Sequence, residues 1–205
     1  MQALDRRRAL RWLGGFALVL VIGMLPWPGL AVGWSRLWSG LANITVFQPD
    51  FGQGGHARLR PARPEERGTG HNVATDAVLE LQVQGYQGKL PLGISSRRDG
   101  YLPLLVLIAA VVAAPLGWRT RLKHMAVGVP LALAVCLVLT RLGVAAVFAF
   151  RLRGVYPPDS FGRTVLAAAE QVLVLPPALR FFAPLLIALG LAWSSLRRPA
   201  PSNAV

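Results

Sequence analysis

The chain has 205 residues, of which 54% are hydrophobic and only 15% are charged, so it is too apolar for an ordinary soluble domain. The formal net charge is +13, but the basic residues stand at the margins of apolar runs and not along one stripe, which argues against nucleic acid as a partner. The single cysteine, Cys136, excludes an intrachain disulfide. The composition therefore predicts an all-α integral membrane protein.

Four apolar runs predict four transmembrane helices, because about 20 apolar residues cross a hydrocarbon core. They cover residues 12–34, 101–118, 125–150 and 178–196. The basic start, residues 1–11, also resembles a secretory signal, which leaves open whether the first helix is removed by cleavage. Its length and the tryptophans at its expected interfaces favour an uncleaved anchor.

The positions of arginine and lysine predict the orientation. Residues 1–11, 119–124 and 197–205 share one side, are short and basic, and hold Asp5 as their single acid. Short basic segments stay in the cytoplasm, so we expect both termini there. Residues 35–100 and 151–177 then lie outside.

The larger outer region, residues 35–100, predicts a small β-hairpin subdomain. Apolar and polar residues alternate on both sides of a turn over residues 77–95, which is typical of a hairpin. Residues 43–48 also alternate and predict a short strand, whereas the Gly- and Pro-rich residues 52–72 predict a loop. In the second outer segment, residues 163–175 predict an amphipathic helix in the membrane interface.

A polar step, Ser-Arg-Arg-Asp-Gly, stands directly before the second span and is the first candidate site. Arg97 and Arg98 are placed to reach lipid phosphates or the acids of a partner. Asp99 is expected to cap the helix that starts near Gly100, and Tyr101 fits the interfacial aromatic belt. Two interpretations stay open: a helix cap with anchoring arginines, or a surface that docks another membrane protein.

Arg141 is the second candidate, because it is a charge deep inside a predicted span. It either extends toward the outer headgroups or pairs with an acid such as Asp99 or Glu170, or with a carboxylate of another subunit.

Residues for catalysis, a cofactor or a metal are not expected. Cys136 lies in an apolar helix without a histidine nearby, which favours inert packing. His56, His71, Asp50 and Asp76 lack a recognised ligand spacing.

The stretch from Leu79 to about Leu142 resembles the small membrane proteins that accompany exosortase H-type protein-sorting transpeptidases. The shared features are the Ile-Ser-Ser-Arg-Arg step into a span that begins GYLPL, the exit PLGWRTRL, and a last span of the FFAPLLIALGLAW kind. The resemblance implies an accessory protein of the bacterial inner membrane beside an exosortase-like partner. Exosortases themselves carry cysteine in an Ala-Cys-Ser-Gly-like context, whereas Cys136 stands in AVCLVL, so transpeptidase activity is not implied.

The favoured hypothesis is a non-catalytic accessory subunit that is surrounded by membrane lipids and docks a multi-span membrane protein. It does so through the outer hairpin and through Arg97 and Arg98 of the polar step before the second span. One alternative is a membrane enzyme that acts on a lipid or peptide through Arg141 and the outer arginines. Another is a small transporter subunit, although the predicted spans show no internal repeat.

Overall fold

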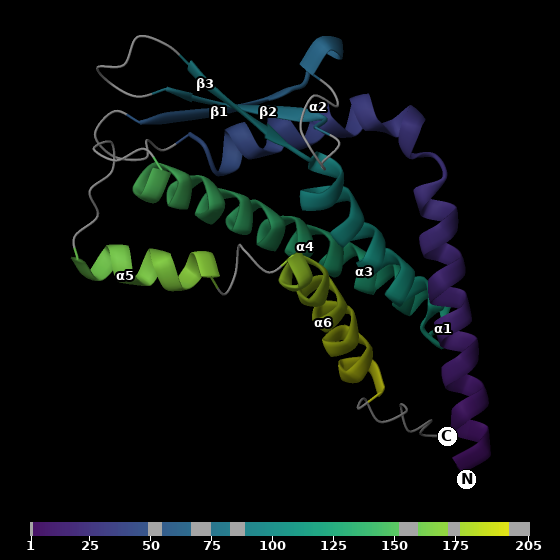
Figure 1. The fold of residues 1–205 in the computed structure, drawn as a ribbon. Helices are drawn as coiled ribbons and strands as arrows, with labels where there is room; N and C mark the ends of the chain where they lie inside the picture. The colour runs from purple at the N-terminus through teal and green to yellow at the C-terminus, as the bar shows by residue number, and fades with distance from the viewer. Residues whose placement is uncertain are drawn as a thin grey trace.

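The computed structural model describes residues 2–48, 55–66, 75–82, 89–151, 160–171 and 177–196. Most of these residues are helical, and a small sheet stands at one end of the helices (Figure 1). The helices are α1 (Gln2–Met24), α2 (Trp27–Thr45), α3 (Leu102–Ala113), α4 (Trp118–Ala146), α5 (Ser160–Ala169) and α6 (Pro177–Leu196). The strands are β1 (His56–Pro61), β2 (Ala77–Gln82) and β3 (Lys89–Ile94). Three short helical segments complete the fold: the 3-10 helix η1 (Pro64–Glu66) and the π-helices η2 (Arg97–Tyr101) and η3 (Val147–Arg151).

The first apolar run does not form the single helix predicted over residues 12–34. Helix α1 ends at Met24, and the chain bends by 80° into α2. Pro26 and Pro28 explain the break, since proline disrupts a helix interior but is tolerated in a first turn. Helix α2 therefore crosses the end of the helices next to the sheet (Figure 1).

The predicted hairpin over residues 77–95 is confirmed in the described part. Strands β2 and β3 pair antiparallel, with Leu79 opposite Leu92. The sheet has a third strand, β1, which pairs antiparallel with β2. It lies within residues 52–72, where the sequence predicted a loop, and the strand predicted over residues 43–48 is instead the end of α2 and the turn after it.

The sheet is joined to the helices by the main hydrophobic core. Trp38 of α2, Leu59 and Leu79 of the sheet, and Phe148 after α4 are fully buried in one cluster. Burial of such side chains is the main stabilising term in folding. The sheet and the helices therefore form one body.

Helix α3 packs against α1, α4 and α6. It ends before Pro115, as expected because the residue before a proline disfavours helical geometry. Helix α4 begins at Trp118, so residues 119–124, predicted as a cytoplasmic loop, are its first turns. Helix α5 lies along α4 on the side away from the sheet (Figure 1). It begins at Ser160, and residues 172–175 of the predicted interfacial helix lie outside the described residues.

Among the described residues, one helical stretch, Trp118–Phe150, is long and apolar enough to cross a membrane. The bent pair α1 and α2 would be a second if it counted as one span. Helix α3 has 12 residues, a length of about 18 Å against a hydrocarbon core of about 30 Å. Within the ranges that the structure describes, the predicted four spans of full length are therefore not confirmed. Large apolar side chains such as Leu18, Val127 and Leu186 are 57–65% exposed, a feature of membrane-associated surfaces.

Candidate docking site

The candidate docking site is the segment Ser96–Tyr101, where β3 gives way to α3. The backbone N–H groups of Ser96 and Arg97 donate to the carboxylate of Asp76, at 2.5 and 3.2 Å, and the Ser96 hydroxyl donates to it at 3.0 Å. The first N–H groups of a helix have no partner within the helix, so this carboxylate caps it. The sequence predicted that Asp99 would do so, which is wrong. Burial raises the pKa of Asp76 above its ordinary value in spite of these hydrogen bonds.

Asp99 instead lies inside η2 and is 4% exposed. Its carboxylate forms an ion pair with Arg180 near the start of α6, and a second with Arg98, at 2.9 Å. The side chain of Arg180 is 10% exposed, whereas that of Arg98 is 47% exposed. Because a buried charge needs a partner, Asp99 fixes α6 against η2.

Arg180 is a site residue that the sequence analysis missed. The signal that could have found it is a single arginine directly before the apolar run FFAPLL, on the outer side of the last predicted span. An arginine at that place is ordinarily assigned to headgroup anchoring. Only the fold shows that a buried carboxylate faces it.

Aromatic side chains of α2 support this segment. The Tyr101 hydroxyl donates to the backbone carbonyl of Gly23 at the end of α1. Its ring centre lies 4.8 Å from that of Trp27 and 5.6 Å from that of Trp34. The indole N–H of Trp34 donates to the carbonyl oxygen of Ser96 at 3.1 Å. Tyr101 therefore joins α1, α2 and α3, whereas the interfacial position that the sequence predicts for it stays a prediction.

The guanidinium of Arg97 lies over the ring of Trp27, 5.4 Å from its centre, a cation–π arrangement. The ring of Trp38 packs on Gly100, where a Cβ atom would come within 2.7 Å of it. The two arginines thus have different surroundings: Arg97 rests on an aromatic surface, and Arg98 extends into solvent from a buried acid. Such an arrangement holds two cations close together and favours an anionic partner.

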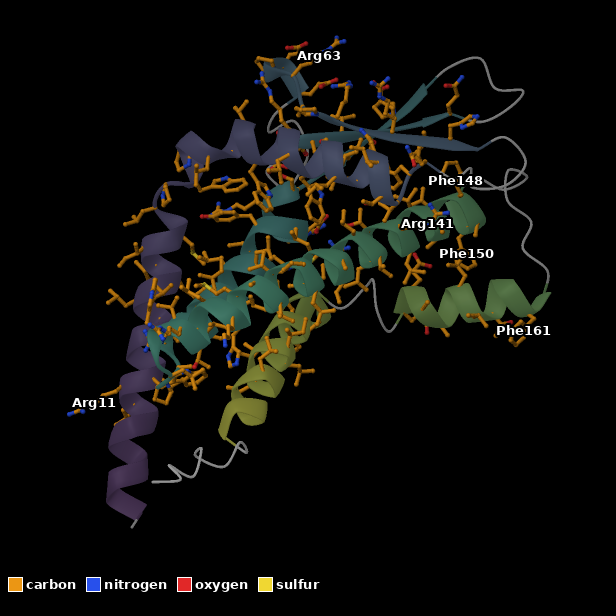
Figure 2. The ribbon with its side chains drawn as sticks, turned by 180° about the vertical axis from the view of Figure 1, so that it is seen from behind. Arg11, Arg63, Arg141, Phe148, Phe150 and Phe161 are labelled. Atoms are coloured by element: carbon orange, nitrogen blue, oxygen red, sulfur yellow. The ribbon has the colours of Figure 1, made fainter. Side chains whose placement is uncertain are left out.

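Arg141 does not join this segment. It donates through Nη1 to the carbonyl oxygen of Val46, the residue that ends α2. The last carbonyl groups of a helix have no hydrogen-bond donor within the helix and carry partial negative charge, so the guanidinium of Arg141 stabilises the end of α2. The pairing with Asp99 that the sequence offered is therefore wrong, since Asp99 binds Arg98 and Arg180. Figure 2 shows Arg141 on α4, on the stretch that leads to Phe148 and Phe150.

The other titratable residues that the sequence analysis singled out lie in different parts of the fold, as far as the structure describes them. Within the described ranges, no group of three or more His, Cys, Asp or Glu side chains could hold a metal ion. Asp76 caps η2 and His56 is exposed on β1, while Asp50 and His71 lie outside the described residues. Cys136 is a free, buried thiol in the core below the sheet.

Comparisons with family models, with curated proteins and with solved structures find no match to this chain.

Proposed function

We propose that the chain is a non-catalytic membrane accessory subunit that docks an acidic surface of another membrane protein through Arg98 and the neighbouring hairpin. In this proposal α1, α3, α4 and α6 lie in the bacterial inner membrane with the termini in the cytoplasm, and the sheet lies outside. The exposed apolar side chains of α1, α4 and α6 support it. Arg11 on α1 and Arg63 beyond β1 mark opposite ends of the molecule (Figure 2).

The edges of the sheet favour docking by side chains over the addition of a strand. On β1, the Asn43 side chain accepts from the N–H of Leu59 at 2.9 Å and donates to its carbonyl at 2.7 Å, as a neighbouring strand would. On β3, the carbonyl of Ile94 accepts a hydrogen bond from the backbone N–H of Asp76, so the backbone groups of Ile94 point toward β2. Backbone groups alternate in direction along a strand, so those of Pro91 point toward the open edge of the sheet. Proline has no N–H to offer a further strand there. Both edges are protected, which is how soluble sheets avoid strand exchange.

The single observation that carries the proposal is the ion pair between Asp99 and Arg180 beneath Arg98. Asp99 is held by the buried arginine of α6, so Arg98 is fixed by a carboxylate that a partner cannot reach. A guanidinium held in one place loses less conformational entropy on binding than a free one. Arg98 is therefore prepared for a carboxylate or phosphate at the surface.

The resemblance to exosortase-associated proteins supplies a candidate partner, an exosortase-like membrane transpeptidase, and this identity is part of the proposal. Its test is co-purification. The full chain, tagged and expressed in its native host, is extracted in mild detergent and analysed by mass spectrometry. We expect one multi-span protein to be recovered in constant ratio to the chain.

Two variants test the docking site. Arg98→Gln should weaken binding of that partner by about tenfold or more, the size of an interface hot spot. Arg58→Gln is the matched control, because Arg58 is an exposed arginine of β1 on the same end of the molecule. Equal recovery of the partner by wild type and Arg98→Gln, with both proteins folded, would contradict the proposal. Equal losses in both variants would mean general charge attraction and not a defined site.

A further inference from the structure

Two successive apolar hollows follow α3 between α1 and α6. The outer one has a volume of about 470 Å³ and the inner one about 320 Å³. Their lining residues repeat every fourth position, from Leu102 of α3 to Ala114 directly after it, and from Trp12 to Met24 on α1. Residues four apart are neighbours on a helix surface, so the two hollows follow each other along α1 and α3, and together they are called the groove. In Figure 1, α3 runs between α1 and α6.

The length of this groove fits one lipid tail. Helix α3, which carries this side of the groove, has 12 residues with a rise of about 1.5 Å each, which gives about 18 Å. One leaflet of the hydrocarbon core is about 15 Å deep. A transmembrane helix of a partner would need a contact surface of about twice that length to be covered through the membrane. The volumes also lie in the range of sites for small ligands, and the lining side chains are apolar.

A basic group stands at the outer end of the groove. The N–H of Leu102 donates to the carbonyl of Arg97, so Arg97 lies one helical turn above the first residue of the groove. Its guanidinium is over Trp27, which follows Met24, the last groove residue of α1, across the bend. Within the described part of the chain, the Nε–H of Arg97 is buried without a hydrogen-bond acceptor. Buried donors are almost always satisfied, so this N–H is a group that an acceptor oxygen of a bound ligand would satisfy.

We infer that this groove and Arg97 bind one anionic phospholipid, with an acyl chain along α3 and the phosphate on the guanidinium of Arg97. A phosphate oxygen supplies the acceptor that Nε–H lacks, and guanidinium matches its geometry. The tail fills apolar surface that would otherwise form a gap between α1 and α6. The site rests on the placement of the chain in a membrane, but not on the protein partner, because it uses Arg97 and the groove while the partner site uses Arg98.

The test is native mass spectrometry of the full chain, stripped of lipid in detergent and titrated with phosphatidylglycerol or phosphatidylcholine of identical acyl chains. We expect one phosphatidylglycerol per chain, with a half-saturating concentration about tenfold below that for phosphatidylcholine. Arg97→Gln should remove that preference. Arg58→Gln, which deletes an exposed arginine away from the groove, should keep it.

A second variant tests the tail independently of the charge. Val106→Trp places a large side chain in the outer hollow and should reduce binding of both lipids with Arg97 intact. Inorganic phosphate should not displace the lipid, because the groove supplies the apolar contacts. Lipid binding that stays unchanged in both Arg97→Gln and Val106→Trp, in proteins with unchanged circular dichroism, would overturn the proposal of this site. So would a partner helix crosslinked along α3 in place of lipid.

Discussion

Removal of Arg180 gives the sharpest test of the candidate site. The Asp99 carboxylate is 4% exposed and is paired with Arg180, so Arg180→Gln leaves a buried charge with only Arg98. Breaking a buried pair by removing one partner costs about 3–5 kcal/mol. Arg98 remains on the same oxygen, but its side chain is 47% exposed, and exposed pairs are worth about 0–1 kcal/mol. The variant should therefore lose about 3 kcal/mol of unfolding free energy.

The assay is denaturant unfolding of the detergent-solubilised chain, followed by near-ultraviolet circular dichroism of its tryptophans. Arg98→Gln is the matched control and should cost about 1 kcal/mol or less, since it removes the exposed partner of the same acid. The double variant Asp99→Asn with Arg180→Gln should be more stable than Arg180→Gln alone, because no uncompensated charge remains. Equal costs for Arg98→Gln and Arg180→Gln, or strict additivity in the double variant, would refute the reasoning.

Gly100→Ala should destabilise the chain by about 1–3 kcal/mol, because its Cβ would lie 2.7 Å from the ring of buried Trp38. Gly29→Ala is the control and should leave the stability unchanged, because a Cβ there meets nothing within 4 Å. The melting temperatures of the two variants measure the difference. Beside the sheet, hydrogen bonds from Arg60 hold the pKa of Glu66 at about 2, below its ordinary 4.5. The unfolded chain binds this proton more readily, so the pair stabilises above pH 4.5 and its contribution is lost as the pH falls toward 2. The difference in unfolding free energy between wild type and Glu66→Gln should therefore shrink as the pH falls from 4.5 toward 2. A difference that stays constant over this pH range would contradict the role of the Arg60–Glu66 pair.

The parts of the fold that the sequence predicted are those with local, periodic signals. The alternation of Leu79 and Leu81 with polar residues predicted β2, and pairing with β3 followed from the short separation. Strand β1 was missed although Ala57 and Leu59 alternate with charged residues, because the signal is short and lies among glycines and prolines. The backbone groups of β1 are satisfied by pairing with β2 and by the side chain of Asn43. Both partners lie far from β1 in the sequence, so the residue pattern of β1 itself does not indicate them.

The same difference between local and long-range signals explains why the sequence analysis assigned the wrong role to Asp99. The sequence placed an acid next to a helix start and predicted that Asp99 would cap it, which is the usual local rule. The cap is Asp76, twenty residues before Ser96 in the chain, and Asp99 is taken by an arginine of α6. Long-range partners of charged groups depend on how the helices pack. A single sequence without their arrangement does not give them.

The buried ion pair between Asp99 and Arg180 connects the segment Ser96–Tyr101 to the helices. Arg180 begins the described apolar part of α6, while Asp99 stands between the sheet and α3. A charge in a low-dielectric setting has few acceptable partners, and a shift of α6 along α3 by one turn, about 5.4 Å, would leave Arg180 without its carboxylate and Asp99 with only the exposed Arg98. The pair therefore sets the register of α6 against α3. Because Arg98 is bound to the same carboxylate, a partner that displaces Arg98 would act on the register of α6, and a partner that leaves it in place would bind a fixed surface.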